Sequence, residues 1–376
     1  MKAAKNRGTV ARGRLDLVYI RQVCIAVLLA LLLLTTAGAA AIPQLHVAQL
    51  TKTNCAYGNF YPSVDSAAKK VAFTSFCDLV PGGNSDGNSE LYFMNTNGTG
   101  LVQLTHTTGG VGVVQPYLAA NGQSIVFASD RDLISGNNAD GNYEIFTIST
   151  NGTNLKQLTN TVGGRGDLGY PGNTGPCFDP KAQKITFSSD RDLVSGHNSD
   201  GNNDMFLMNA DGSGLTQLTF TTGGFGVGGG CLNGADTQVV FDADRDLVPG
   251  HNTDGNYEIF SMAVHGNGVV QLTNTTSPAS GIGNVGARWT SNGNTVFFRS
   301  DVDLTGNNPD ANQEAFRVNA DGTGLVQLTC TVGGFGSTIW AVTPNGKTLV
   351  IESDGDLVPG NNLDRNGEIY TMKITP

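Results

Sequence analysis

The sequence has few of the residues that usually carry metal or acid–base chemistry. Its 376 residues include five histidines, six cysteines and two tryptophans, and aromatic residues make up only 7% of the chain. No set of Cys and His residues has the spacing of a zinc site. The apolar residues after residue 42 also lack helical periodicity. These absences argue against zinc enzymes and helical folds, and they predict an all-β chain.

Positive charge is also scarce once the first 41 residues are set aside. The remaining chain has 16 basic and 31 acidic residues, which gives a net charge of −15. Such a surface repels nucleic acid and anionic lipid, so we expect no nucleic-acid partner. The acidity is compatible with cations or basic partners, although in many proteins it serves only solubility.

The first 41 residues have the pattern of a secretory signal peptide. A basic lead with six Lys and Arg residues precedes an uncharged run at 23–42, which ends in small residues at 37–41. The run is also long enough to span a membrane, so an uncleaved anchor is the alternative. Either way we expect the remaining chain outside the cytoplasm, periplasmic or secreted. Membrane contact is expected only if the segment stays uncleaved.

The tripeptide Gln-Leu-Thr recurs through the chain at nearly constant spacing. Successive copies start 54, 54, 60, 54 and 56 residues apart. The copies begin at Gln49, Gln103, Gln157, Gln217, Gln271 and Gln327. A period of this size is nearest to that of β-propeller blades, which commonly have about 40–45 residues. The extra length falls in one loop, between the second and third strands of each repeat.

The second repeat illustrates the predicted blade. Its four strands are expected at 116–119, 124–129, 143–149 and 155–159. A long acidic loop at 130–142 separates the second strand from the third. Asn-Gly and Asp-Gly pairs, such as Asn151-Gly152, mark the hairpins. We expect type I′ turns there, because these residues tolerate the positive φ that both central positions require.

Counting the repeats predicts a single six-bladed β-propeller domain over residues 42–376, with four strands in each blade. The blades are expected at 60–105, 115–159, 175–219, 230–273, 287–329 and 339–373. The last repeat ends without its Gln-Leu-Thr strand, and an unpartnered strand of this kind stands at 46–51. We expect strand 46–51 to complete the sixth blade, because this closes the ring and removes two open sheet edges.

Five cysteines follow residue 41, and an exported chain is expected to pair some of them. Cys55 lies in a loop that leaves a fourth strand, and Cys77 begins a loop between a second and a third strand. These two kinds of loop share one rim of a propeller, so we expect a Cys55–Cys77 disulfide. Cys177 and Cys231 occupy equivalent positions in consecutive repeats, and for them we expect inner-strand packing without a bond. The odd count leaves one cysteine over.

Each acidic loop carries oxygen-bearing side chains around a glycine turn, which partly matches a calcium loop. The candidate ligands are Asp86, Asn88, Glu90, Asp140, Asn142, Glu144, Asp200, Asn202, Asp204, Asp254, Asn256 and Glu258. The spacing is not that of an EF-hand, and Asp-Gly-Asn is a turn sequence in its own right. The alternative is a purely structural loop, in which Glu144 pairs with Arg131. Because the last two repeats alter the glycine, at Ala311 and Gly367, we expect any metal in the first four.

The repeat reads Ser-Asp-Arg-Asp, then Asp-Gly-Asn-x-Glu-Ile-Phe, Met-Asn-Ala-Asp-Gly and Leu-Thr, which resembles the repeat of TolB-type six-bladed propellers. The resemblance covers residues 46–373, and it departs from the family by an insertion such as 193–199. TolB has an α/β domain ahead of its propeller and binds a peptidoglycan-associated lipoprotein in the periplasm. We expect that the residues before position 46 are too few for that domain. The resemblance therefore implies the fold, whereas the partner does not transfer with it.

No residue of the sequence stands out as catalytic. His197 and His251 occupy a position that other repeats fill with Gly or Asn, and we expect no acid to break the repeat as a catalytic pair would. Trp289 and Trp340 are expected in inner-strand packing. We therefore expect a monomeric, non-enzymatic scaffold that binds a protein or envelope component. The alternative is a carbohydrate-active enzyme, a polysaccharide lyase or glycoside hydrolase that uses rim carboxylates, and a deep channel with paired acids and aromatic residues would favour it.

Overall fold

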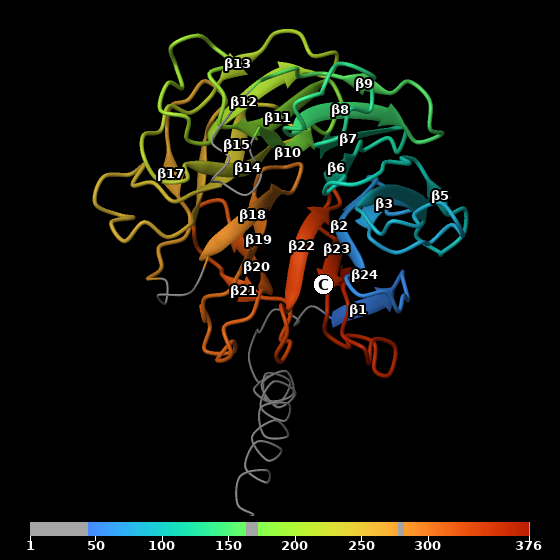
Figure 1. Ribbon diagram of the computed structural model, residues 1–376. Coiled ribbons are helices and arrows are strands. Elements are labelled where there is room, and N and C mark those ends of the chain that lie inside the picture. The colour runs from blue at the N-terminus through green and yellow to red at the C-terminus, as the bar shows by residue number, and fades with distance from the viewer. Residues whose placement is uncertain (1–43, 163–171, 277–281, 376) are drawn as a thin grey trace, which may run out of the picture. The chain divides into compact units, whose positions relative to one another are not determined.

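Each repeat folds into one antiparallel sheet of four strands, and the six sheets form the blades of a ring (Figure 1). The structure is a computed structural model that describes residues 44–162, 172–276 and 282–375. The predicted signal segment at 1–41 lies outside the described residues. The prediction of an all-β, six-bladed propeller with four-stranded blades is confirmed.

The strands follow the chain from the inside of each blade outward. Blade 1 consists of β2 (Asn59–Val64), β3 (Lys70–Ser75), β4 (Glu90–Asn95) and β5 (Val102–Gln103). Blade 2 consists of β6 (Val113–Leu118), β7 (Ser124–Ser129), β8 (Glu144–Ser149) and β9 (Lys156–Gln157). Blade 3 consists of β10 (Asn173–Phe178), β11 (Lys184–Ser189), β12 (Asp204–Asn209) and β13 (Thr216–Gln217). Blade 4 consists of β14 (Val227–Leu232), β15 (Gln238–Ala243), β16 (Glu258–Ala263) and β17 (Val270–Gln271). Blade 5 consists of β18 (Asn284–Trp289), β19 (Thr295–Ser300), β20 (Glu314–Asn319) and β21 (Val326–Gln327).

The N-terminal strand closes the ring. Blade 6 contains β22 (Ser337–Val342), β23 (Thr348–Ser353) and β24 (Glu368–Thr375), and β1 (Gln44–Gln49) pairs with β24 at its outer edge. The Leu50 amide extends this pairing by donating to the Ile369 carbonyl at 2.8 Å. The predicted closure is therefore confirmed, with the strand beginning at Gln44 and not at His46.

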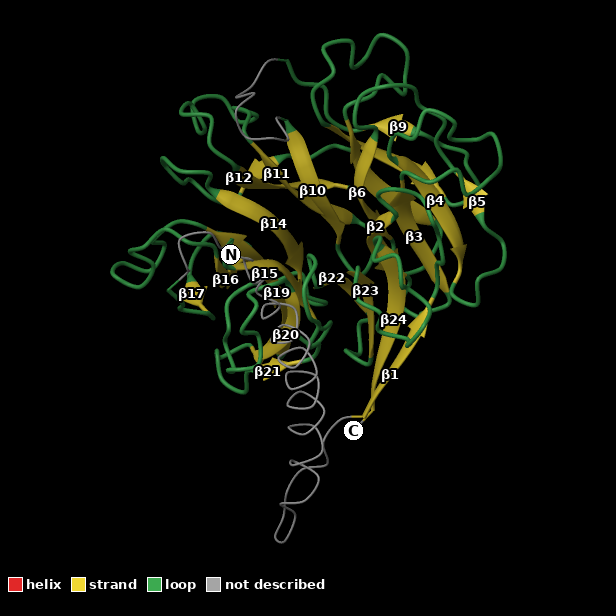
Figure 2. Ribbon diagram, turned by 60° about the horizontal axis from the view of Figure 1, so that its bottom comes forward, coloured by secondary structure: helices red, strands yellow, loops and turns green. Residues whose placement is uncertain are grey.

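Strands and loops make up the described part of the chain (Figure 2), and within it no helix is long and apolar enough to cross a membrane. Residues 46–374 form the compact unit that carries the ring. The first strands of neighbouring blades pack against one another around its axis, as β10 does against β6 and β14. The short fourth strands lie at the outside of the ring (Figure 1).

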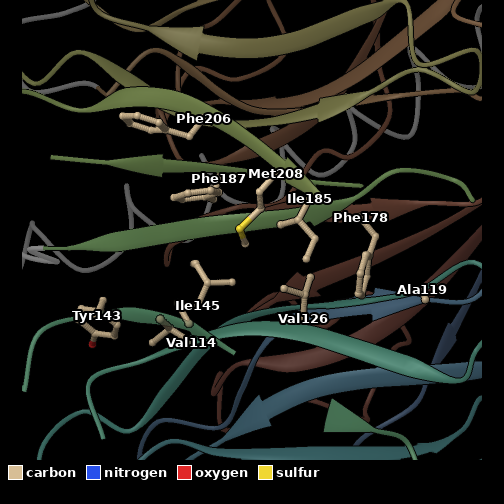
Figure 3. Close-up of a cluster of buried hydrophobic side chains, with 11 residues drawn as sticks. Val114, Ala119, Val126, Tyr143, Ile145, Phe178, Ile185, Phe187, Phe206 and Met208 are labelled. Atoms are coloured by element: carbon tan, nitrogen blue, oxygen red, sulfur yellow. The ribbon is translucent and has the colours of Figure 1, made fainter. Parts of the chain in front are cut away.

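The hydrophobic core lies between neighbouring blades. Figure 3 shows one such cluster, in which Val126 and Ile145 of blade 2 face Ile185 of blade 3. Within a blade, aromatic rings of the second and third strands stack, as Phe127 does on Phe146 with ring centroids 5.6 Å apart. Because blades pack face to face, both faces of each sheet are apolar, and the alternation of apolar and polar residues along the strands is weak.

The hairpins use a different turn from the predicted type I′. In the turn of blade 1, Gly98 has a φ of 81°, whereas the preceding Asn97 has no positive φ. The Gly98 amide donates to the Asn95 carbonyl, and the Asn95 amide donates to the Thr99 carbonyl. This is a type I turn followed by a left-handed glycine, the three-residue hairpin that ends in a bulge. The Asn-Gly signal located the hairpin correctly but gave the wrong turn type.

Among the described residues, two disulfides link segments that the ring brings together. Cys55 is joined to Cys77, between a loop that leaves a fourth strand and a loop that follows a second strand. Cys177 is joined to Cys231 with 5.6 Å between their Cα atoms, so the expectation of packing without a bond is wrong. Strands β10 and β14 come close because two glycines face each other beside this bond. A Cβ on Gly175 would lie 3.2 Å from the Gly229 Cα.

We expect the Cys177–Cys231 bond to contribute strongly to stability. The bond spans 54 residues, and restricting an unfolded loop of this size is worth about 4 kcal/mol in the chain-entropy account. The double variant Cys177→Ala/Cys231→Ala should therefore have a clearly lower midpoint in non-reducing calorimetry. The matched control is Cys55→Ala/Cys77→Ala, which opens a bond spanning 22 residues and should lose less. An unchanged midpoint in the first variant would contradict this account.

Candidate functional site

One face of the ring carries two kinds of loop. The acidic loops connect the second and third strands, and the exit loops lead from each fourth strand to the next blade. Hydrogen bonds join the two kinds, because the Gly109 amide donates to Asp86 Oδ2 at 2.9 Å and the Gly333 amide donates to Asp310 Oδ2 at 2.7 Å. We call this side of the ring the exit-loop face. All the predicted calcium ligands belong to its acidic loops or to the strand starts that follow them.

The acid that opens each third strand is buried and accepts hydrogen bonds from the end of the fourth strand. In blade 4, Glu258 accepts bonds from the Thr273 hydroxyl and from the amide and hydroxyl of Thr275, at 2.5–2.6 Å. The equivalent acids, bonded to the equivalent threonines, are Glu90, Glu144, Asp204, Glu314 and Glu368. Glu144 therefore does not pair with Arg131, whose Nε donates to the adjacent Asp130 at 2.8 Å. That part of the structural alternative is wrong.

In alternate blades the same acid also reaches the next blade. An asparagine at the start of a first strand donates its Nδ2 to the acid of the preceding blade. The pairs are Asn173 with Glu144 (2.8 Å), Asn284 with Glu258 (2.9 Å) and Asn59 with Glu368 (3.2 Å). The other three first strands have Val113, Val227 and Ser337 at this position. The buried acids thus tie third strand to fourth strand and, at three seams, blade to blade.

Several of the other predicted calcium ligands form hydrogen bonds with protein groups. Asp200 accepts a bond from the Gly223 amide at 3.2 Å, and Asn256 Nδ2 donates to the Thr275 carbonyl at 3.0 Å. The buried amide oxygens of Asn88, Asn142, Asn202 and Asn256 have no hydrogen-bond partner among the described residues. Within the same residues, no group of three or more His, Cys, Asp or Glu side chains is placed to hold a metal ion. Calcium binding therefore stays a prediction, with most of its acid ligands already used by protein donors.

Substituting two acids of blade 4, Glu258 and Asp254, distinguishes a structural role of these residues from a role in metal binding. Glu258→Ala should lower the free energy of unfolding by about 3 kcal/mol or more, because it leaves several buried donors without an acceptor. Asp254→Ala, at an exposed position in the same loop, should change it by less than about 0.5 kcal/mol. Urea unfolding of metal-stripped protein measures both. A calcium-selective stabilisation that either substitution abolishes would instead support the metal role.

An aspartate after each second strand, from blade 2 onward, fixes the exit loop that enters the same blade. Asp130 accepts bonds from the Val111 amide at 3.1 Å and the Gly112 amide at 2.9 Å. The equivalent aspartates whose contacts fall wholly in the described ranges are Asp244, Asp301 and Asp354. Blade 1 has Phe76 at this position, and there the Cys55–Cys77 disulfide joins the two loops. The backbone of these exit loops is thus held firmly.

Exposed apolar side chains lie at these fixed positions. Tyr57, Val111, Phe225, Ile282 and Phe335 each precede the glycine before a first strand, and between 38% and 65% of each is exposed. Because first strands surround the axis, these residues encircle the mouth of the central channel, and we call them the apolar ring. The equivalent residue of blade 3 lies outside the described residues. A set of exposed apolar side chains on a fixed backbone is typical of an interaction surface.

Below the apolar ring, the axis of the propeller holds a cavity of about 420 Å³. Ile282 of the apolar ring and Tyr257 of an acidic loop line it on one side. Arg288, Arg299 and Trp340 of the inner strands line it as well. This volume falls in the range of small-molecule sites, about 300–1,000 Å³.

One position of the second strands breaks the six-fold repeat, and in blades 3 to 5 the residue at this position lines the channel. In register with one another, these strands place Thr74, Ala128, Ser188, Asp242, Arg299 and Glu352 there. Blades 4 to 6 therefore carry three charges where blades 1 to 3 carry small residues. The expectation that no acid breaks the repeat is wrong. The sequence contained this signal. When the six second strands are aligned, the three charged residues fall at the same position, the fifth of each strand.

Hydrogen bonds and ring contacts hold these charges in place. Glu352 Oε2 accepts bonds from the Tyr61 amide at 3.0 Å and from Trp340 Nε1 at 2.9 Å. The Arg299 guanidinium lies over the Trp340 ring, 4.3 Å from its centroid. Asp242 Oδ1 accepts a bond from the Gly286 amide at 2.9 Å. Trp340 thus lies beside an acid and a cation at the channel, so its predicted role in inner-strand packing covers only part of what it does.

Burial controls the protonation of the two acids. It raises the pKa of Asp242 to about 6 and that of Glu352 to about 7, although nearby Arg299 opposes both shifts. Burial also lowers the pKa of the Arg288 and Arg299 guanidinium groups. The net charge of the channel therefore becomes more positive between neutral and mildly acidic pH.

Glu352 should make stability fall as the pH rises. The carboxyl binds its proton more tightly in the folded chain than in the unfolded one, so its contribution is present at low pH and is lost as the pH passes about 7. Glu352→Gln keeps the acceptor but cannot titrate. Relative to wild type, its free energy of unfolding should improve by about 2 kcal/mol between about pH 5 and pH 8.

Urea unfolding of wild type and Glu352→Gln at both pH values measures this effect. A difference between the two that does not change with pH would mean that the folded carboxyl has no raised pKa.

Comparison with known proteins supports the architecture. No protein-family model and no curated protein matches the sequence. A putative TolB from Agrobacterium tumefaciens has a TM-score of 0.55 and 16% identity, with 90% of this chain and 100% of that chain covered. TolB from Acinetobacter baumannii has a TM-score of 0.53 and 13% identity, with 81% of this chain and 63% of that chain covered. The tricorn protease has a TM-score of 0.51 and 13% identity, with 80% of this chain and 24% of its own covered. Identities this low establish the fold alone, and this chain has the fold of a TolB-type six-bladed β-propeller.

Proposed function

We propose that the protein is an exported, non-enzymatic binding propeller that captures a protein component of the cell envelope on its exit-loop face. The observation that carries this proposal is the apolar ring on its fixed backbone. Two of its members, Phe225 and Phe335, have their amides bonded to Asp244 and Asp354 at 2.9 and 2.8 Å. Rigid aromatic anchors of this kind contribute most of the binding energy at protein interfaces.

Charge on the same face specifies the partner further. The acidic loops place exposed aspartates around the apolar ring, and these are Asp86, Asp140, Asp200, Asp254, Asp310 and Asp364. A complementary surface has an apolar centre and a basic rim, because opposite charges at the rim speed association and exclude wrong partners. The partner we propose is therefore a protein with such a patch.

Export has its own support. The described chain contains two disulfides, Cys55–Cys77 and Cys177–Cys231. Structural disulfides persist in oxidising compartments such as the periplasm or the exterior of the cell, and they are rare in the cytosol. This agrees with the signal-peptide pattern of residues 1–41. The propeller therefore acts outside the cytoplasm in this proposal.

A double substitution in the apolar ring tests the docking face. Phe225→Ser/Phe335→Ser should reduce retention of an envelope protein on the immobilised propeller by at least about tenfold, which corresponds to about 1.4 kcal/mol. Quantitative mass spectrometry of proteins retained from an envelope extract measures this. Val102→Ser/Val270→Ser is the matched control, because these valines are 41% and 47% exposed on fourth strands, away from the ring.

The same proteins retained at the same level by wild type, ring variant and control would overturn the proposal. Retention by wild type and control, weakened by salt and lost in the ring variant, would support it, because the exposed acids are screened by ions.

A carbohydrate-active enzyme, a polysaccharide lyase or glycoside hydrolase, is the second candidate. The observation in its favour is Asp242 at the channel and Glu352 behind the channel residue Trp340, with pKa values of about 6 and about 7, a range suited to proton transfer. Incubation with a panel of polysaccharides, followed by assays for new reducing ends and for unsaturated products, tests it. Turnover that is abolished by Glu352→Gln would favour the enzyme, whereas absence of turnover leaves the binding propeller as the proposal.

A further inference from the structure

The cavity wall contains an arginine that stacks on an aromatic ring but has no hydrogen-bonding partner among the described residues. Arg299 makes no hydrogen bond and no ion pair with the described residues, and its Nη1 is buried without an acceptor. An arginine carries five N–H donors in a planar fork that matches a carboxylate. Burying such a group without a partner destabilises a fold. A side chain kept in this state at a cavity wall is therefore a candidate ligand group.

We propose that the central channel is a binding site for a small organic carboxylate that also carries hydroxyl groups, with Arg299 as its main partner. This site lies below the apolar ring, with which it shares Ile282, and its ligand differs from the protein that docks on the exit-loop face. The carboxylate would accept bonds from the free side of the Arg299 guanidinium. Arg288, which lines the same cavity, adds a second positive charge.

The orientation of Arg299 is set before any ligand arrives. Its guanidinium stacks on Trp340, and the ring of Tyr61 meets Trp340 edge-on with centroids 4.6 Å apart. The indole is fixed in turn by its bond to Glu352, and the Trp340 carbonyl accepts a bond from Arg288 Nε at 3.1 Å. Preorganised donors lose little conformational entropy on binding. Trp340 is thus a positioning residue for the anion site.

The hydroxyl groups of the ligand have acceptors nearby. Asp242 lines the cavity and uses Oδ1 for the Gly286 amide. Its second oxygen lies where a side chain at position 228 would otherwise be, since a Cβ on Gly228 would come 2.0 Å from Asp242 Oδ2. The cavity thus contains an acceptor, Asp242, and a donor group, the Arg299 guanidinium. Together they match a ligand that has a carboxylate at one end and hydroxyl groups along its body. The cavity of about 420 Å³ accommodates a molecule of monosaccharide size.

Protonation of the acids should strengthen this site. Asp242 is in the field of Arg299, Arg288 and Tyr257, and Glu352 is in the field of Arg299 and Asp354. When these two carboxylates are protonated, the positive charge of Arg299 is no longer compensated and attracts an anion more strongly. A carboxylate ligand with an ordinary pKa stays ionised at about pH 5.5. Its affinity should therefore rise as the pH falls from about 8 to about 5.5.

Isothermal titration of the full chain with D-glucuronate tests the proposal. D-Glucose is the matched neutral ligand, because it has a hydroxymethyl group where glucuronate has its carboxylate. We expect glucuronate to bind at least about tenfold more tightly than glucose. We also expect glucuronate binding to be about tenfold tighter at about pH 5.5 than at about pH 8.

Substitutions at Arg299 identify the site. Arg299→Met keeps a long side chain against Trp340 and should abolish the preference for glucuronate and its pH dependence. Arg299→Lys keeps the charge without the planar fork and should weaken binding by about tenfold. Arg317→Met, on β20 away from the cavity lining, is the control with unchanged binding.

The outcomes separate this site from the docking face. No glucuronate binding, equal binding of glucose, or binding unaffected by Arg299→Met in a variant that keeps the wild-type unfolding midpoint would each overturn the anion site. None of these results bears on the envelope partner, which is tested by Phe225→Ser/Phe335→Ser. If Arg299→Met does not fold, Arg299→Lys decides the question alone, because unchanged affinity in that variant overturns the role of the guanidinium fork.

Discussion

The structure depends on a buried carboxylate at the start of every third strand. A carboxylate removed from water is tolerated only where donors replace the lost hydration. Here the donors are two threonines of the fourth-strand end, for example Thr273 and Thr275 around Glu258. The fourth strand has only two residues in blades 1 to 5, so its own ladder is short and these bonds help to hold it on the blade. The most regular feature of the sequence, Gln-Leu-Thr-x-Thr, is the donor half of this interaction.

Residues outside the hydrogen-bond network differ from one repeat to another. The carboxylate network and the exit-loop aspartates satisfy the backbone on one face of the ring, whereas the fifth position of the second strands lines the channel in blades 3 to 5. In blades 4 to 6 this position carries Asp242, Arg299 and Glu352, and the first two line the cavity. The residues of the carboxylate network are thus repeated in every blade, whereas the residues at the channel differ between blades. This is expected when a binding site is added to a common fold.

The sequence predicted the features that follow from the number of repeats. Counting Gln-Leu-Thr gave six blades, and the leftover strand gave the closure of β1 on β24, because both follow from the number of strands. Features that depend on a distance between blades were missed. The Cys177–Cys231 bond needs the close approach that Gly175 and Gly229 allow, which cannot be read from equivalent positions alone. The alternative in which Glu144 pairs with Arg131 rests on opposite charge alone, whereas the carboxylate is buried and accepts bonds from the amide and hydroxyl of Thr161.

The cross-blade asparagines divide the ring into unequal seams. Asn59, Asn173 and Asn284 bridge blades 6 to 1, 2 to 3 and 4 to 5, and the seam between blades 3 and 4 has the Cys177–Cys231 bond instead. The seams between blades 1 and 2 and between blades 5 and 6 have neither of these links. The seam between blades 5 and 6 is crossed at the channel by the stack of Arg299 on Trp340 and by the bond from Arg288 Nε to the Trp340 carbonyl. A molecule held at Arg299 would add one more contact across this seam, so occupancy of the channel and cohesion of the ring are coupled there.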